Sequence, residues 1–352
     1  MTLDGLVPDP EIRDPGLLET DVAIVGAGPA GLFAAFQCGM LRLGCVLIDA
    51  LSETGGQCTA LYPEKPIYDI PAHPGIEAGA LVAALERQVA PFEVPRLLGR
   101  RVEGLSGTRG AFRLRTDRGD TVAARAVLIA AGAGAFGPNR PPLDGLASFE
   151  AAGAVQYFVR SRAAFAGRSV AIAGGGDSAV DWALSLKDIA ARVWLIHRRE
   201  RFRAAPDSLA RLDAAVARGE IEKVVPYQLH GLAGMNGALS GVTVATLDGA
   251  TRVLEADRLL AFFGLSTDLG PIATWGMQTG LHGLIPVTPS TLETTLPGVF
   301  AIGDVASYPG KLKLILTGFS EAAMAVHAIH AVARPEQALR FEHSTTRGLP
   351  VA

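Results

Sequence analysis

The sequence predicts an α/β protein with two Rossmann-like dinucleotide-binding units, each carrying a β-meander insertion. Three observations support this fold class. A strand, a glycine-rich turn, a helix and a second strand follow one another in residues 21–49, and the same order returns in residues 168–199. The chain has 352 residues, which is long for a single domain, and 49% of them are hydrophobic, which is enough to form large buried cores.

The first repeat, residues 21–49, reads DVAIVGAGPAGLFAAFQCGMLRLGCVLID. Gly26 permits a tight turn, Gly28 lets backbone N–H groups approach a pyrophosphate, and Gly31 lets the helix lie close to the strand. The helix N-terminus presents unpaired N–H groups and a partial positive charge to the phosphates. Asp49 ends the second strand, 23 residues after Gly26, where a carboxylate can accept hydrogen bonds from a ribose diol. The repeat therefore predicts a dinucleotide site.

The second repeat, residues 168–199, carries Gly174, Gly176 and Ala179 in a G-x-G-x-x-A frame. Alanine at the third position suits a helix that needs slightly more room beside the strand. Counting 23 residues from Gly174 gives His197, so a histidine stands where the first repeat has its terminal carboxylate. We therefore expect the two sites to bind different nucleotides.

Arginines follow His197 at positions 198, 199, 201 and 203. Guanidinium groups bind a 2′-phosphate with paired, charge-assisted hydrogen bonds, whereas a carboxylate repels it. Arg198, Arg199 and Arg203 thus predict NADPH, in preference to NADH, at the second site, and a nucleotide with a free ribose at the first. The alternative is that these arginines only form a solvated basic strand end.

The phrase GVFAIGDVA, residues 298–306, places Asp304 directly after a short strand. Its carboxylate can then meet ribityl hydroxyls, which favours FAD at the first site. The next helix, expected over residues 314–332, can direct its positive N-terminus toward a flavin pyrimidine. Two nucleotide sites on separate domains suggest one bound flavin and one exchanging nicotinamide.

Two hinge-like stretches, residues 138–142 and 265–270, set the expected domain boundaries. Between the repeats we expect an amphipathic helix over residues 76–92 and a β-meander over residues 94–127. A second meander precedes the second hinge. The predicted division is an FAD-binding domain in two parts, residues 1–142 and 266–352, around an NADPH-binding domain, residues 143–265.

Composition argues against several other classes. A net charge of −3 gives no overall attraction to nucleic acid or anionic lipid. Cys38, Cys45 and Cys58 form neither a C-x-x-C pair nor a metal-ligand spacing, so we expect no metal site and a reducing, cytoplasmic location. Residues 22–41 are apolar enough to suggest a membrane span, but three glycines and Pro29 make a poor spanning helix, so none is predicted.

The motifs GAGPAG, GGQ, GGGDSA, HRRERFRA and GVFAIGD together resemble the two-domain flavoproteins of the thioredoxin reductase type. That resemblance implies thioredoxin-reductase-like architecture. Those enzymes carry a C-x-x-C dithiol in the NADPH domain, but this chain has no cysteine after Cys58, so it cannot relay electrons through such a pair. The phrases ALYPEKPIYDI, FAGRSVAIAGGGDSAVDWAL, IHRRERFRA and HSTT resemble the ferredoxin/flavodoxin–NADP reductases of the same fold, which also lack the dithiol.

This resemblance implies that Tyr62 stacks on one flavin face and the tail residue His343 on the other. A stacked phenol tunes the flavin potential and shields the ring, and a tail imidazole limits access to it. The alternatives are that Tyr62 is a loop aromatic that packs in the hydrophobic core and that His343 is an exposed tail residue. Cys58 has no partner cysteine, so we assign it no redox role. The FAD contacts that the resemblance implies are Asp49, Gly56, Gln57, Tyr62, Val102, Phe136, Asp304 and Thr345.

The implied activity is hydride transfer from NADPH to FAD, followed by single-electron transfer to ferredoxin or flavodoxin. The resemblance further implies a homodimer, in which one subunit's tail covers the partner's flavin. Rival functions are a flavin oxidase, a small-disulfide reductase and a non-enzymatic redox-sensing module. Because such carriers are acidic, we expect a basic docking patch. Its candidates are Arg96, Arg100, Arg101, Arg140, Lys311 and Lys313.

Overall fold

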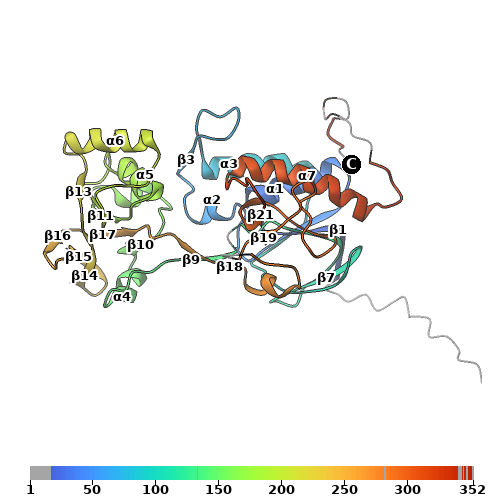
Figure 1. The fold of residues 1–352 in the computed structure, drawn as a ribbon, viewed down its shortest axis with the longest axis horizontal. Coiled ribbons are helices and arrows are strands. Elements are labelled where there is room, and N and C mark those ends of the chain that lie inside the picture. Colours follow the sequence, from blue (N-terminus) through green and yellow to red (C-terminus); the bar gives the residue numbers. More distant parts are fainter. Residues whose placement is uncertain are drawn as a thin grey trace, which may run out of the picture.

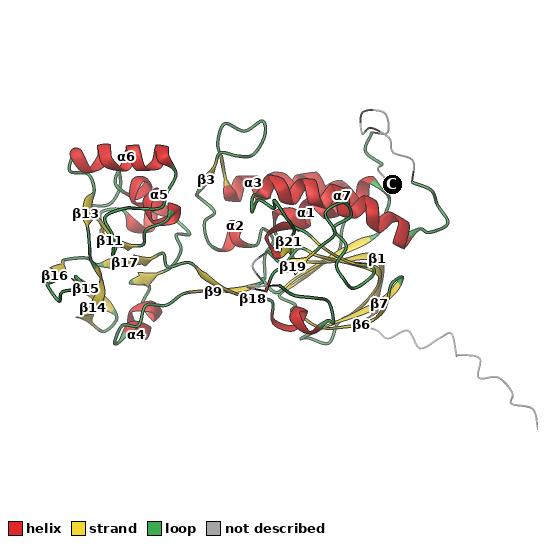
Figure 2. Cartoon of the chain, viewed as in Figure 1, coloured by secondary structure: helices red, strands yellow, loops and turns green. Residues whose placement is uncertain are grey.

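The computed structural model describes residues 17–132, 134–280 and 283–339, together with 343, 345 and 348–350. Two lobes lie at opposite ends of the molecule, and two extended segments, β9 (Ala135–Pro138) and β18 (Leu265–Asp268), join them (Figure 1). Each lobe combines strands with covering helices (Figure 2). The predicted α/β fold with two Rossmann-like units is confirmed.

The larger lobe is built on a seven-stranded sheet. At its centre β1 (Leu17–Val25) runs parallel to β2 (Cys45–Asp49) on one side and to β8 (Thr121–Ile129) on the other. The four outer strands are β5 (Arg96–Leu98) beside β2, β7 (Ala111–Thr116) and β6 (Val102–Thr108) beyond β8, and β20 (Val299–Ala301), which also pairs with β8.

Strand β8 links the meander to the core sheet. Its first half pairs antiparallel with β7, and its last three residues pair parallel with β20. The β-meander expected over residues 94–127 therefore ends inside a strand that continues to Ile129 in the core sheet, because no glycine or proline interrupts residues 121–129. Likewise β5 belongs to the parallel sheet beside β2 and not to the meander.

Three helices pack together in the larger lobe: α1 (Pro29–Met40), α3 (Ala78–Val89) and α7 (Ile315–Ala333) (Figure 1). Among the described helices, α7 is long and apolar enough to cross a membrane, with a hydropathy of 1.3. It nevertheless contacts α1 and β8 and buries nine residues, including Glu321 and His330, as the central helix of a folded core does.

The smaller lobe repeats this plan. Its parallel sheet has the order β10, β17, β11, β12, β13, which corresponds to β20, β8, β1, β2, β5 in the larger lobe. The bounds are β10 (Val155–Gln156), β17 (Arg258–Ala261), β11 (Ser169–Ala173), β12 (Arg192–Ile196) and β13 (Glu222–Val224). Helix α5 (Asp177–Leu186) packs on this sheet, and α6 (Pro206–Ala217) packs against α5. The meander is β14 (Gln228–Met235), β15 (Ala238–Ala245) and β16 (Thr251–Leu254).

The two stretches predicted as hinges meet at the end of an antiparallel ribbon of β9 and β18, where Pro138, the first residue of one, pairs with Leu265, the first residue of the other. The chain thus leaves and re-enters the larger lobe through one two-stranded ribbon. The remaining short elements are α2 (Gln57–Ala60), β3 (Pro66–Ile67), β4 (Ile76–Glu77), α4 (Leu146–Ala151), β19 (Ile285–Pro286) and β21 (Ala306–Ser307), with 3₁₀ turns at Ala90–Phe92, Arg162–Phe165, Gly270–Thr274 and Gly303–Val305.

Candidate functional site

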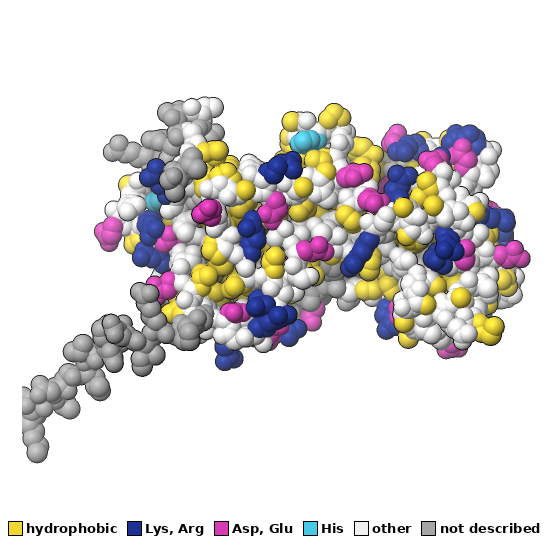
Figure 3. Space-filling view, turned by 180° about the vertical axis from the view of Figure 1, so that it is seen from behind, with side chains coloured by type: hydrophobic (Ala, Val, Ile, Leu, Met, Phe, Trp, Pro, Cys, Tyr) yellow, Lys and Arg dark blue, Asp and Glu magenta, His cyan; other side chains and the backbone are white. Residues whose placement is uncertain are grey.

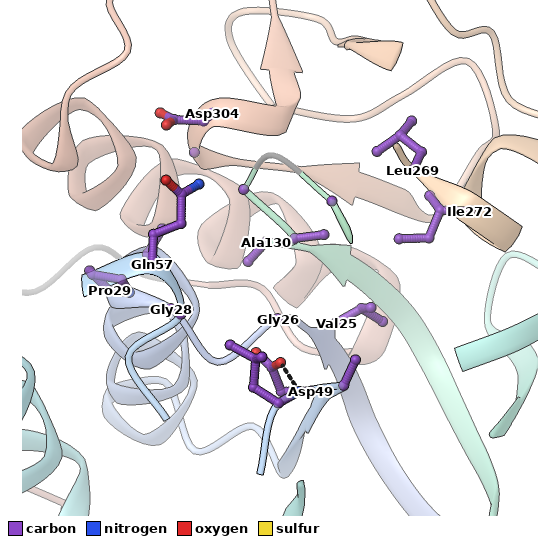
Figure 4. A pocket seen from close by; sticks show the side chains of 18 of the residues that line it. Val25, Gly26, Gly28, Pro29, Asp49, Gln57, Ala130, Leu269, Ile272 and Asp304 are labelled. Atoms are coloured by element: carbon purple, nitrogen blue, oxygen red, sulfur yellow. Dashed lines mark hydrogen bonds between the residues drawn. The ribbon is translucent and has the colours of Figure 1, made fainter. Parts of the chain in front are cut away.

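A cavity of about 510 Å³ lies at the carboxyl ends of β1, β2 and β8 in the larger lobe. The first glycine turn forms one wall, and Gln57 and Asp304 lie on the opposite side from Asp49 (Figure 4). Ligands of open α/β sheets bind in this position, outside the carboxyl ends of the strands. The predicted site residues that line the cavity are Gly26, Gly28, Asp49, Gly56, Gln57, Tyr62, Val102 and Asp304.

The three turn glycines have distinct surroundings. Gly26 has φ +114°, and a Cβ on it would lie 2.3 Å from the carbonyl oxygen of Ala130. A Cβ on Gly31 would lie 2.0 Å from the Gly26 carbonyl oxygen, so this glycine lets α1 approach the strand. A Cβ on Gly28 would have no atom within 4 Å, so the backbone at Gly28 faces open cavity. Space beside Gly28 and helix N–H groups behind it fit a pyrophosphate.

Asp49 is held by the backbone at the edge of this turn. The Ala27 N–H donates to Asp49 Oδ2 at 2.6 Å, and the Leu51 N–H donates to Oδ1 at 2.8 Å. Burial raises the pKa of Asp49, and these two hydrogen bonds oppose that rise. The carboxylate keeps further lone pairs for a diol in the cavity, as a ribose-binding residue requires.

Tyr62 lies between the two lobes. It lines the cavity and packs against hydrophobic residues of both lobes. The Cys58 thiol donates to its hydroxyl oxygen at 3.9 Å. Burial raises the pKa of Tyr62, and burial also raises the pKa of Cys58 to about 11, so both groups are protonated at neutral pH. A protonated, buried thiol is a poor nucleophile, which agrees with giving Cys58 no redox role.

Two predicted residues do not line the cavity, and the side chain of a third lies outside the described part of the structure. His343 and Thr345 are exposed, and neither lines the cavity among the described residues. Phe136 lies in β9, but its side chain falls outside the described part of the structure. Their roles toward FAD stay predictions.

The structure adds lining residues that the sequence reasoning missed or assigned elsewhere. Arg100 and Arg101, expected at a docking surface, line the cavity next to Asp49. Residues 269–272, which directly follow β18, also line the cavity. The Arg100 N–H donates to the Asp49 carbonyl oxygen at 2.9 Å, a contact between β2 and a later segment that no local motif signals.

The second glycine turn is in the smaller lobe, between β11 and α5. A Cβ on Gly175 would lie 2.1 Å from the His197 ring, so that ring rests on the turn. The Arg203 N–H donates to the Gly175 carbonyl oxygen at 2.6 Å, and the Ala205 N–H donates to Asp177 Oδ1 at 2.8 Å. The arginine-bearing segment therefore folds back over the turn, bringing cations to a predicted phosphate site. The predicted residues of this turn are Gly174, Gly176, Ala179, His197, Arg198, Arg199 and Arg203.

His197 offers a pH-sensitive probe of this turn. Burial lowers its pKa, and the charges of Arg198, Arg199 and Arg203 lower it further. We expect the midpoint of the His197 titration to lie below 6.5. It can be measured by NMR with labelled histidine, and His197→Gln assigns the signal. Adding NADP⁺ should raise the midpoint, because a phosphate offsets the arginine charges. An unchanged midpoint on adding NADP⁺ would contradict phosphate binding here.

Most docking candidates already have acidic partners. Arg96 pairs with Glu86, Arg100 with Asp120, Arg101 with Glu103, and Arg140 with Glu150. Lys311 is buried, with 7% of its side chain exposed, and pairs with buried Glu321, so it is a wrong candidate. On the face drawn in Figure 3, basic and acidic side chains are interspersed.

The comparisons with known proteins agree on one family. Residues 20–329 match the model of the pyridine nucleotide-disulphide oxidoreductases. The chain is 72% identical over 339 residues to a ferredoxin–NADP reductase of Gluconacetobacter diazotrophicus, covering 96% of this chain and 99% of that protein. A ferredoxin–NADP reductase of Granulibacter bethesdensis is 69% identical over 350 residues, covering 99% and 100%.

Solved structures with this fold include a thioredoxin reductase of T. acidophilum, at 22% identity and a TM-score of 0.77, with 89% of this chain and 98% of that chain covered. A Lactococcus lactis thioredoxin reductase gives 23% identity and a TM-score of 0.76, with 89% and 99% covered. At such identity these neighbours bear on the fold alone. Both the motif-based resemblance and the thioredoxin-reductase-like architecture are confirmed.

Proposed function

Because this chain belongs to the pyridine nucleotide-disulphide oxidoreductase family, we propose that it transfers electrons between NADPH and ferredoxin through bound FAD. The observation that carries the proposal is the pairing of two different nucleotide turns in one chain. One turn opens into a cavity edged by a carboxylate, and the other is bordered by arginines. The names of the relatives point to the same activity.

The residues of the cavity suit FAD. The open backbone at Gly28 and the N-terminus of α1 would hold the pyrophosphate, and Asp49 would accept hydrogen bonds from the adenosine ribose. Asp304 would face the ribityl hydroxyls, while Tyr62 would cover one ring face. When bound, FAD accepts a hydride and gives up electrons singly, so the side chains need only position it and exclude water. In the other lobe Arg198, Arg199 and Arg203 would hold the 2′-phosphate of NADPH.

We assign the larger lobe to FAD and the smaller to NADPH, with the division at residues 142 and 265. The sheet topology supports this division, since each lobe has its own parallel sheet and the chain crosses between them through the β9–β18 ribbon. A rotation about this ribbon would bring nicotinamide to and from the flavin.

Besides the packing of Tyr62 against both lobes, two polar contacts in the described residues hold the lobes in their present arrangement. Lys65 Nζ lies 2.9 Å from Asp181 Oδ2, and the Arg162 N–H donates to Glu64 Oε2 at 2.6 Å. The Lys65–Asp181 pair is partly exposed, so it is worth at most about 1 kcal/mol. The pair can therefore favour the present lobe arrangement over a rotated one by no more than about 1 kcal/mol.

Replacing Lys65 with Met should shift the population of lobe arrangements by up to about fivefold, because roughly 1 kcal/mol is lost. Fluorescence energy transfer between dyes on the two lobes measures this shift. Asp181→Asn should give a similar shift, and the double variant should add little to either. An unchanged distribution in both single variants would show that the pair does not restrain the lobes.

We further propose that flavodoxin is an alternative carrier, that the chain forms a homodimer and that it works in the cytoplasm. Three free, buried cysteines support a reducing compartment. The same cysteines make a disulfide reductase a poor second candidate, since none is placed as an accessible dithiol.

The test is anaerobic stopped-flow spectroscopy of the purified flavoprotein. NADPH should bleach the flavin absorbance within the turnover time, and added ferredoxin should restore it. NADH should be far less effective. Rapid oxygen consumption that ferredoxin does not change would favour an oxidase instead. A protein that binds no FAD would overturn the proposal.

A further inference from the structure

A buried ion pair lies behind the cavity, at the second turn of α7. The side chains of Glu321 and Lys311 are 2% and 7% exposed, and Lys311 Nζ donates a hydrogen bond to Glu321 Oε1. The Tyr308 hydroxyl donates to the same oxygen at 2.6 Å. Burying a pair of charges is costly unless all their hydrogen bonds are satisfied, so this cluster calls for a physical explanation beyond stability.

Glu321 reaches the turn that carries Asp304. Its Oε2 accepts the Gly303 N–H at 2.7 Å. Gly303 has φ +72°, a conformation that favours glycine, and both Gly303 and Asp304 line the cavity. The carboxylate thus holds the backbone that presents the predicted ribityl-binding residue.

Lys311 belongs to the segment that leads into α7. Through Lys311 and Tyr308 the same carboxylate holds residues 308–311, just before Leu314, Ile315 and Gly318, which line the cavity. Burial and the bond to Glu321 raise the pKa of Tyr308 to about 12, so its hydroxyl remains a donor at neutral pH. One side chain therefore ties together two separate parts of the cavity wall.

We infer that Glu321 and Lys311 are positioning residues for the flavin: together they fix the Gly303–Asp304 turn and the N-terminal end of α7, and their balanced charges set the flavin potential. The inference rests on the proposed placement of FAD in this cavity. A charge left unpaired at this depth acts on the cavity with little screening by solvent. Removing either partner should therefore change the potential, and the sign should depend on which charge remains.

Three variants separate this role from simple stabilisation. Lys311→Met leaves a buried negative charge and should lower the flavin midpoint potential. Glu321→Gln leaves a buried positive charge and should raise it. The double variant is uncharged; its glutamine can accept the Gly303 N–H and donate to Tyr308, so the potential should return toward that of the unmodified protein. Each single variant should also weaken FAD binding by about tenfold, about 1.4 kcal/mol.

Arg334→Met is the matched control. Arg334 pairs with Asp21 at 2.7 Å and holds the other end of α7, away from the cavity. It should lower thermal stability without moving the potential. Potentials are measured by dye-coupled reduction and FAD affinity by fluorescence titration of the apoprotein. The inference would be overturned if both single variants shifted the flavin potential equally and with the same sign, or if neither shifted it while still binding FAD. Either result would leave the proposed function intact. Failure of the unmodified chain to bind FAD would overturn both.

Discussion

Replacing Arg198 and Arg199 together with Ala should raise the KM for NADPH about 100-fold or more and change the KM for NADH little. Each guanidinium would make a charge-assisted hydrogen bond to the 2′-phosphate, worth about 1.5–3 kcal/mol. Losing two removes at least about 3 kcal/mol, and each 1.4 kcal/mol is tenfold in binding. NADH has no 2′-phosphate, so it loses neither contact.

The measurement is flavin reduction with each nucleotide over a concentration series. Arg211→Ala with Arg218→Ala is a suitable control, because it removes the same charge from exposed positions in the middle and at the end of α6. That control should leave the ratio of the two KM values unchanged. If the Arg198 and Arg199 variant weakened both nucleotides equally, the 2′-phosphate assignment would be wrong.

The sequence predicts the two nucleotide turns well because their signals are local. Gly26, Gly28 and Gly31 have backbone requirements that a short pattern expresses, and the structure places the first turn at the cavity. The matched spacing to Asp49 and His197 works for the same reason: Asp49 is the last residue of β2, and His197 directly follows β12. The family relationship, drawn from longer phrases, is confirmed by the family match over residues 20–329 and by the 72% identity to a relative over 339 residues.

Contacts between distant segments are harder to predict. The β9–β18 ribbon joins residues about 130 positions apart, and neither strand has a distinctive pattern. Lys311 was expected on the surface because lysines are rarely buried unless paired, and its partner Glu321 sits within an apolar helix. Arg100 and Arg101 were expected in a docking patch for the same reason. Only the fold brings Arg100 and Arg101 to the cavity and Lys311 to Glu321.

Replacing Gly28 with Ala should abolish tight FAD binding while leaving the apoprotein as stable as before. A Cβ there meets no protein atom within 4 Å, and Gly28 has φ −72°, which alanine adopts readily. The added methyl would occupy the space that the pyrophosphate needs beside the backbone. We expect FAD affinity to fall about 100-fold, about 2.8 kcal/mol. Fluorescence titration of the apoprotein measures the affinity, and thermal unfolding without FAD measures the stability.

Gly31→Ala provides the contrast. Its Cβ would lie 2.0 Å from the Gly26 carbonyl oxygen, so the backbone must move and the apoprotein itself should lose stability. The two variants thus distinguish a glycine that leaves room for a ligand, Gly28, from a glycine that lets the helix pack closely on the strand, Gly31. Unaltered FAD affinity in Gly28→Ala would mean that the pyrophosphate does not lie against this turn, and the placement of FAD in the cavity would have to be abandoned.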